Sequence, residues 1–207
     1  MKRIFVQIPS YRDPECQWTL KDLFEKAKYP DRVFVGICWQ FYLDTDKACF
    51  EIPFAPDHAG QVRVGGFHWN QSHGVCWARS EAQKLWQGEE YSLVIDSHMR
   101  FVQDWDERMI AALAQCPSPK PLLSSHPASY TPPGNLQADP LPTVLHATPI
   151  SSEGSMRVRG MPLVQVASAY SYATDLQQHI GRPDLRHGAL LHLHGERASL
   201  NINYCKH

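Results

Sequence analysis

The sequence predicts an α/β domain built around a sheet of parallel strands. Two observations support this class. Strand-like, helix-like and strand-like segments follow one another at residues 4–8, 14–29 and 33–39, and a short apolar run at residues 93–95 is typical of a strand covered on both faces. A strand–helix–strand order implies parallel strands joined by a right-handed crossover. The length of 207 residues suits one domain, expected over residues 1–207.

The first unit has clear boundaries. The first strand is expected over residues 4–8, with Pro9 as its end. Asp13 is a favourable helix N-cap, and Pro14 fits the first helical position. Apolar residues then recur at helical spacing, at Cys16, Leu20, Leu23, Phe24 and Ala27. The second strand is expected over residues 33–39, which are rich in β-branched and aromatic residues.

The next segment is less regular. Residues 40–72 are predicted to form a loop-rich insertion that covers the site, with one strand at residues 61–64. A helix is expected to begin at residues 73–74 and to end at Gly88. Its apolar face would comprise Val75, Ala78, Ala82, Leu85 and Trp86. Arg79 lies off this face.

Residues 91–101 are predicted to be a buried strand followed by a loop with an acid and an imidazole, Asp96 and His98. Ligands of open α/β sheets bind outside the carboxyl ends of the strands, which makes both residues candidates for a site. Carboxylate and imidazole groups can bind the same divalent ion. The alternative is that Asp96 caps the following turn and His98 is a hydrogen-bonded surface residue. Residues 10–13 are expected at the same sheet edge.

The second half is harder to interpret. Asp104 is expected to cap a helix whose inward residues are Trp105, Met109, Ala112 and Leu113. A strand is expected over residues 121–125, and another is possible at residues 164–169. The proline-rich residues 127–149 are predicted to be an extended surface loop without regular structure.

Composition excludes several classes of protein. The net charge is −1, from 20 basic and 21 acidic residues, so the composition does not indicate binding to nucleic acid or to an anionic membrane. No apolar stretch is long enough to span a bilayer, and the apolar run after Met1 is too short for a signal peptide. The six cysteines form no CxxC pair, which favours a reducing, cytoplasmic compartment. The sequence contains neither a nucleophile elbow nor His-Glu-x-x-His spacing, so it does not indicate a hydrolase.

Three blocks in order resemble the "GlcNAc" family of glycosyltransferases, which includes cytoplasmic polypeptide N-acetylglucosaminyltransferases. They are IFVQIPSYRD at residues 4–13, GVCWAR at residues 74–79, and LVIDSHMRF at residues 93–101 with WD at residues 105–106. In the second block the family usually has proline where this chain has Val75. The resemblance implies a GT-A-type donor domain, a Rossmann-like mixed sheet with helices on both faces, and an Asp-x-His variant of the Asp-x-Asp metal motif.

The tail departs from the family pattern. Residues 195–200, GERASL, match a family segment except that Arg197 replaces a glutamate, and His207 falls on the position of a family histidine. We therefore expect a donor-binding part at residues 1–130 and an atypical acceptor-side part at residues 131–207, truncated or divergent.

The resemblance assigns roles to individual residues. Asp96 is the expected catalytic metal ligand, joined by His98 and by His207 as a third ligand, around Mn²⁺ or Mg²⁺. Glu196 is a catalytic candidate, as a base or in positioning the acceptor, and a surface ion pair with Arg197 is the alternative. The donor would be contacted by Ser10, Tyr11, Arg12, Asp13, Arg79 and Ser97, with Tyr11 stacking on uridine. The alternatives are that Asp13 only caps the helix and that Arg79 lies on a solvated helix face. Arg100 is expected to form a structural ion pair, and Trp105 is expected to pack in the core.

Together these features predict a metal-dependent glycosyltransferase. It would move a sugar, expected to be GlcNAc, from a UDP-sugar such as UDP-GlcNAc to a hydroxyl of a protein or glycan acceptor. The alternative is an inactive homologue that only binds the nucleotide-sugar. Release of UDP in the presence of Mn²⁺ distinguishes the two.

Overall fold

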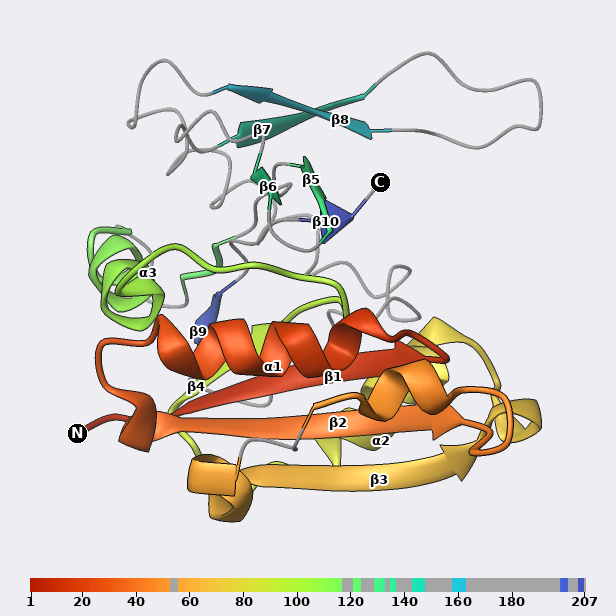
Figure 1. Cartoon of the computed structure of the whole chain (residues 1–207). Coiled ribbons are helices and arrows are strands. Elements are labelled where there is room, and N and C mark those ends of the chain that lie inside the picture. Colours follow the sequence, from red (N-terminus) through yellow and green to blue (C-terminus); the bar gives the residue numbers. More distant parts are fainter. Residues whose placement is uncertain are drawn as a thin grey trace.

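The main body of the protein is a five-stranded parallel sheet flanked by helices, as seen in a computed structural model (Figure 1). The strands lie in the order β3-β2-β1-β4-β9. Their bounds are β1 (Ile4–Tyr11), β2 (Val33–Phe41), β3 (Val62–His68), β4 (Tyr91–Val94) and β9 (Ala198–Leu200). The structure describes residues 1–52, 56–116, 121–123, 129–132, 135–136, 143–147, 158–162, 198–200 and 205–206.

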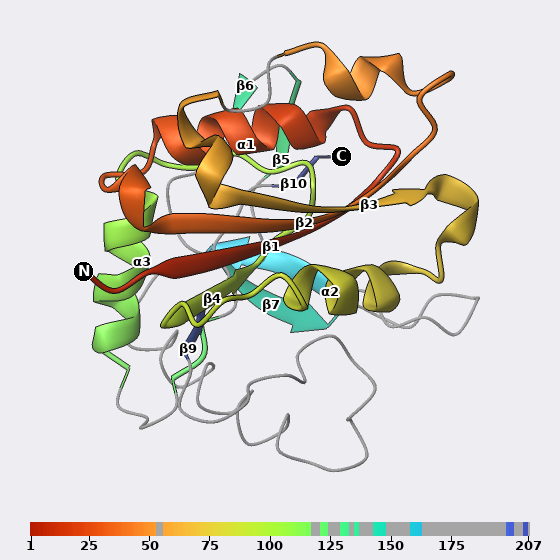
Figure 2. The ribbon, with the colours of Figure 1, turned by 90° about the horizontal axis from the view of Figure 1, so that it is seen from below.

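Among the described residues, three α-helices cover the two faces of the sheet. They are α1 (Glu15–Glu25), α2 (Val75–Gln83) and α3 (Trp105–Ala114). The apolar residues of α1 and α3 share one buried cluster with alternate residues of β1, namely Ile4, Val6 and Ile8. On the opposite face, Gln7 of β1 donates to Gln83 of α2 at 2.6 Å. Helices therefore lie on both faces, and Figure 2 shows α1 and α2 on opposite sides of the strands.

Short helical turns and strands complete the described chain. The 3₁₀ turns are η1 (Pro30–Arg32), η2 (Lys47–Phe50), η3 (Pro56–Gln61) and η4 (Trp69–Gln71). Two small sheets lie apart from the main one: β5 (Ser129–Thr131) pairs with β6 (Asn135–Leu136) and β10 (Cys205–Lys206), and β7 (Thr143–Ala147) pairs with β8 (Val158–Pro162). None of the helices in the described part of the chain has the length and apolar character needed to cross a membrane.

The α/β class and the first strand–helix–strand unit are confirmed, since β1 and β2 pair in parallel on either side of α1 in the chain. The mixed sheet implied by the family resemblance is not what the described strands form, because every pair in the main sheet is parallel. Antiparallel pairing is confined, among the described residues, to the two small sheets.

The first strand continues through Pro9, where its end was predicted, and pairs with β2 as far as Tyr11. The backbone groups of Gln7 point to the same edge of β1 as those of Pro9. The carbonyl oxygen of Gln7 accepts a hydrogen bond from the backbone N–H of Ile95. Because β4 ends at Val94, opposite Gln7, the missing N–H of Pro9 removes no bond of the β1–β4 ladder. A proline at that position therefore does not interrupt the strand.

The prediction of an irregular loop over residues 127–149 is wrong, since β5, β6 and β7 fall within it. The prolines bound these strands instead of interrupting them: Pro132 follows β5 directly, and Pro142 directly precedes β7. A strand over residues 121–125 is not found in the described part, where Leu122 alone forms an isolated bridge. The strand considered at residues 164–169 lies outside the described residues.

The helix expected over residues 74–88 is shorter than predicted, because α2 ends at Gln83. Ala78 and Ala82 are buried as expected, while Val75, in the first turn, is 52% exposed. Gly88 has a φ of +94°, a conformation that glycine adopts without strain, and it marks the turn into β4. Asp104 precedes α3 as predicted, but it makes no capping bond through its side chain and has a φ of 60°.

Candidate active site

The carboxyl ends of β1 and β4 lie side by side where a ligand of this type of sheet is expected to bind. The chain passes from β1 outward to β2 and β3 and then returns to the other side of β1 to form β4. The strand order thus reverses between β1 and β4, and open α/β sheets bind ligands in the crevice at such a reversal. Asp13 follows β1, and Asp96 and His98 follow β4. The topology therefore brings together the two motifs that the sequence singled out.

Asp13 connects these two strand ends. Its Oδ2 atom accepts hydrogen bonds from Ser97 Oγ and from His98 Nδ1, both at 2.7 Å, and its Oδ1 atom accepts from the backbone N–H of Glu15 at 3.0 Å. Burial alone raises the pKa of Asp13, but the hydrogen bonds from His98, Ser97 and Glu15 outweigh it and lower the pKa from its ordinary value. Asp13 is therefore an ionised carboxylate that joins α1 to the loop after β4.

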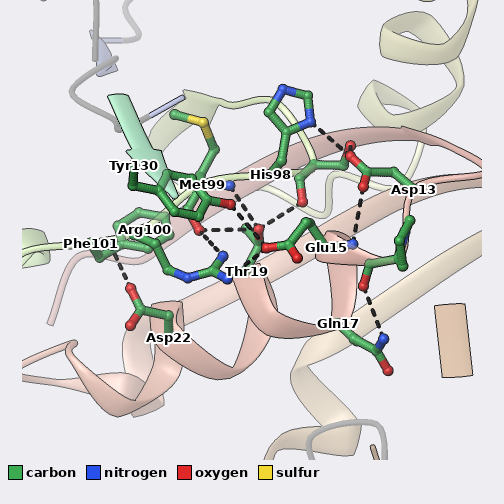
Figure 3. A network of polar contacts seen from close by, with 12 residues as sticks. Asp13, Glu15, Gln17, Thr19, Asp22, His98, Met99, Arg100, Phe101 and Tyr130 are labelled. Atoms are coloured by element: carbon green, nitrogen blue, oxygen red, sulfur yellow. Dashed lines mark hydrogen bonds and ion pairs between the residues drawn. The ribbon is translucent and has the colours of Figure 1, made fainter. Parts of the chain in front are cut away.

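The loop of residues 97–101 is held along the side of α1. The hydroxyl of Thr19 donates to the carbonyl oxygen of Ser97 at 2.7 Å and accepts from the N–H of Met99 at 2.8 Å. One turn farther along, Asp22 Oδ2 accepts from the N–H of Phe101. Figure 3 shows these side chains pointing from α1 toward the loop. Backbone groups that lack a sheet partner are thus satisfied by the polar side chains of one helix.

Arg100 forms the structural ion pair that was expected of it. Its Nη2 atom lies 2.6 Å from Glu15 Oε2, and its Nη1 atom donates to the carbonyl oxygen of Met99 at 2.9 Å. Tyr130 adds a hydroxyl bond to the same Glu15 oxygen at 3.0 Å, and the Arg100 guanidinium lies 4.6 Å from its ring centre. Because Arg100 is only 5% exposed, it fixes the loop and does not face a ligand. Trp105 is likewise buried, as predicted, and its Nε1–H donates to Leu23.

Asp96 and Arg79 meet across the edge of the site. Arg79 Nη2 lies 3.3 Å from Asp96 Oδ1, and the two side chains are 30% and 45% exposed. Arg79 comes from α2, on the face of the sheet opposite α1. Its Nε atom is buried and has no hydrogen-bond partner among the described residues. Arg79 therefore faces the predicted metal motif from the other side.

The remaining predicted donor contacts at the end of β1 differ in their accessibility. Ser10 is fully buried, and its carbonyl oxygen accepts from Gln40 Nε2. Tyr11 is 50% exposed. Arg12 has a φ of 49° and binds the carboxylate of Asp46 through Nε and Nη2, at 2.8 to 3.1 Å. Only Tyr11 of these three presents an uncommitted, open side-chain surface.

Asp96 and His98 suit a divalent cation in their chemistry. They supply an exposed carboxylate oxygen and an imidazole whose Nδ1 is hydrogen-bonded to a second carboxylate, as is common for metal-binding histidines. Within the part of the chain that the structure describes, no group of three or more His, Cys, Asp or Glu side chains is arranged to hold a metal ion. His207 and Glu196 lie outside the described residues, so the predicted third ligand and base have no position here.

Sequence reasoning missed the polar residues of α1 that shape the site. Thr19 and Gln17 are buried, although they lie between the apolar positions that were taken as the inward face. Gln17 accepts from the N–H groups of Glu51 and Ile52 and donates to the carbonyl oxygen of Ala48. The two residues serve different neighbours, since Thr19 binds the loop after β4 and Gln17 binds the segment around η2.

A comparison with protein families identifies one relationship. The family model described as "Glycosyltransferase (GlcNAc)" matches residues 3–59 and 54–187. These two segments contain all of the predicted site residues except Glu196 and His207. No curated protein matches the chain.

Proposed function

The chain belongs to the glycosyltransferase (GlcNAc) family, and from this premise we propose that it is a metal-dependent enzyme with a GT-A-type donor domain. In this proposal it transfers a sugar, GlcNAc in the first instance, from a UDP-sugar to a hydroxyl of a protein or glycan. Residues 1–130 bind the donor, and residues 131–207 belong to the acceptor side.

One observation carries the proposal. His98, from the loop after β4, is hydrogen-bonded at 2.7 Å to Asp13, from the end of β1, at the reversal point of the sheet. Ligands of α/β sheets bind at such a point. The Asp-x-His motif is therefore supported from a second strand in the place where a nucleotide-sugar would bind.

In the transfer, the bond between the anomeric carbon and the diphosphate oxygen breaks, and the acceptor oxygen bonds to the anomeric carbon. A divalent cation such as Mn²⁺ or Mg²⁺ stabilises the negative charge of the departing UDP. Asp96 and His98 are the proposed ligands, with His207 as the third. Glu196 is proposed to act on the acceptor side, as the base for the hydroxyl proton or by positioning the acceptor.

Arg79 and Tyr11 are the proposed contacts to the rest of the donor. The Arg79 guanidinium is suited to phosphate, which it can bind through two N–H groups. Its position beside Asp96 supports this role, as does its buried Nε, which has no hydrogen-bond partner in the part of the chain that the structure describes. Tyr11 has an exposed ring at the end of β1 that can stack on uracil. Ser97, which is bonded to Asp13, helps to hold this end of the site. The buried free thiols of Cys16, Cys38 and Cys49 support a reducing, cytoplasmic compartment.

Calorimetric titration of UDP-GlcNAc with and without Mn²⁺ tests the proposal, followed by an assay for released UDP. The variants are Asp96→Asn and, as a control of equal charge change, Asp31→Asn. Asp31 is exposed and lies in η1, which leads into the amino end of β2, at the opposite edge of the sheet. We expect Mn²⁺-dependent binding in the wild type and in Asp31→Asn, and its loss in Asp96→Asn.

The outcomes separate the two functions considered. Binding with UDP release supports the transferase. Binding without release, across a panel of protein and glycan acceptors, supports a protein that only holds the nucleotide-sugar. Equal binding by Asp96→Asn and the wild type would refute the assigned metal site.

A further inference from the structure

The side chain of Asp13 serves two elements through its two oxygen atoms. Oδ1 accepts from the N–H of Glu15, in the first turn of α1, which is the helix-capping role expected from the sequence. Oδ2 accepts from Ser97 and His98, which lie 84 and 85 positions away in the chain. A cap alone needs only one of these oxygens. The second oxygen is directed at the metal motif.

The bond from His98 to Asp13 selects the form of the imidazole. An ionised carboxylate can only accept hydrogen bonds, so His98 Nδ1 must carry the hydrogen in this contact. In a neutral imidazole the lone pair then resides on Nε2, which is the form that can bind a metal ion through Nε2. The Ser97 hydroxyl donates to the same Asp13 oxygen and so holds the carboxylate in place beside the ring.

The loop that carries His98 is fixed independently of Asp13. Thr19 binds both Ser97 and Met99, and Asp22 binds Phe101. Figure 3 shows that Asp13 lies at one end of this row of contacts, beside the imidazole, and Asp22 at the other end. The loop therefore has other anchors, and the distinct contribution of Asp13 is to the imidazole ring.

From this geometry we propose that Asp13 is a positioning residue: it holds His98 as the Nδ1-protonated tautomer, the form in which Nε2 would be the nitrogen that binds a divalent cation. The inference rests on the proposed metal-dependent function. It differs from the donor contact that the sequence suggested for Asp13, because three donors within the chain already occupy its carboxylate. Loss of such a carboxylate partner lowers metal affinity by about 10- to 100-fold in other sites.

Two variants of Asp13 and one matched control test the proposal. Asp13→Ala removes every acceptor, and Asp13→Asn retains the shape while removing the charge. Asp22→Ala removes a carboxylate of the same helix, bonded to the same loop, without a contact to His98. Two measurements are made on each protein: the ¹⁵N chemical shifts of His98 without metal, at about pH 8, above the usual histidine pKa of about 6.5, and the Mn²⁺ affinity by calorimetry with saturating UDP.

We expect the wild type and Asp22→Ala to have the Nδ1-protonated tautomer and similar Mn²⁺ affinities. Asp13→Ala should lose the preference for this tautomer and bind Mn²⁺ about 10- to 100-fold more weakly. Asp13→Asn tests whether a neutral acceptor oxygen is enough to hold the tautomer. The proposal requires that the tautomer and the Mn²⁺ affinity change together in this variant, so that both are retained or both are lost.

Three results would overturn the inference. The first is an Nε2-protonated His98 in the wild type. The second is an Asp13→Ala protein that binds Mn²⁺ as tightly as the wild type. The third is an equal loss of affinity in Asp22→Ala, which would assign the effect to general loosening of the loop. Failure of the proposed function is distinguishable, because there the wild type itself would not bind Mn²⁺ while its His98 tautomer remains measurable.

Discussion

The hydroxyl oxygen of Thr19 lies 2.8 Å from the backbone nitrogen of Met99, which joins the middle of α1 to the loop after β4. The same hydroxyl donates to Ser97, so one small side chain satisfies a buried donor and a buried acceptor of irregular backbone. Such backbone groups are costly when they are left without partners. Thr19 is therefore a link between helix packing and the geometry of the site.

We predict that Thr19→Val lowers the free energy of unfolding by about 1–3 kcal/mol, the cost of leaving a buried polar group unsatisfied. The change keeps the volume and branching of the side chain, so the loss is due to the hydroxyl. Urea denaturation measures it. Thr19→Ser keeps the hydroxyl and should lose less stability than Thr19→Val. A Thr19→Val protein as stable as the wild type would show that the two hydrogen bonds of the hydroxyl do not contribute to stability.

A second prediction concerns Asp106 in α3, which is fully buried. Its carboxylate accepts from the N–H groups of Lys28 and Tyr29 and from Nε of Arg32, whose Nη2 lies 2.7 Å from Asp106 Oδ2. Removal of one partner leaves a buried charge without compensation, so Asp106→Ala should lower the free energy of unfolding by about 3–5 kcal/mol.

The neighbouring residue is the control for Asp106. Glu107 pairs with Lys28 through side chains that are 44% and 41% exposed. Exposed ion pairs contribute about 0–1 kcal/mol, so Glu107→Gln should change stability little. Chemical denaturation of both variants checks the contrast. A similar small effect for Asp106→Ala would contradict the role of this carboxylate as the anchor between α3 and the turn before β2.

The parts of the fold that the sequence predicted well are those with a clear apolar period. Cys16, Leu20 and Leu23 in α1 are all buried, as their helical spacing requires. The run at residues 93–95 lies in and just after β4, an interior strand between β1 and β9, and Leu93 and Ile95 are buried. The position of Asp96 at the carboxyl end of this strand followed from the same pattern.

What the sequence could not reveal was the pairing of polar groups between distant segments. Asp13 was interpreted as a cap or a donor contact, and nothing near it in sequence indicates the bond to His98. Arg12 was assigned to the donor, yet it binds Asp46 in a loop without periodicity. The direction of a polar side chain depends on tertiary contacts, which local propensity does not encode. Pro9 misled for a related reason, because the cost of a proline depends on whether its missing N–H faces a neighbouring strand.

A third prediction tests the role of Arg79 in donor binding. Hydrogen bonds to charged groups contribute about 1.5–3 kcal/mol, so Arg79→Ala should weaken UDP binding by roughly 10- to 100-fold in calorimetry. Arg79→Lys keeps the charge but loses the planar fork and should bind with intermediate affinity. Lys84→Ala removes an exposed cation that pairs with Glu81 at the end of the same helix, and should bind UDP normally. Unchanged UDP affinity in Arg79→Ala would mean that Arg79 does not bind the donor and that its role is limited to the contact with Asp96.

The last prediction follows from the pair of Arg12 and Asp46. The hydrogen bonds from the Arg12 guanidinium, against the opposing effect of burial, lower the pKa of Asp46 from 3.8 to about 2. A group whose pKa is lower in the folded state stabilises the fold fully above its unfolded pKa, and this contribution disappears as the pH falls through the folded pKa. The contribution of Asp46 should therefore be constant above about pH 5 and should decline between about pH 4 and pH 2.

Thermal unfolding of the wild type and of Asp46→Asn across this range measures the effect. The wild type should have the higher Tm near neutral pH, and the difference should narrow as the pH falls from about 4 toward 2, because the wild-type carboxylate then becomes protonated and resembles the amide in charge. Asp31→Asn, at an exposed carboxylate far along the sheet from this loop, should not reproduce the pattern. A Tm difference that stays constant down to pH 2 would mean that the ionised state of Asp46 does not hold Arg12 in its left-handed conformation, and that shape alone maintains the end of β1.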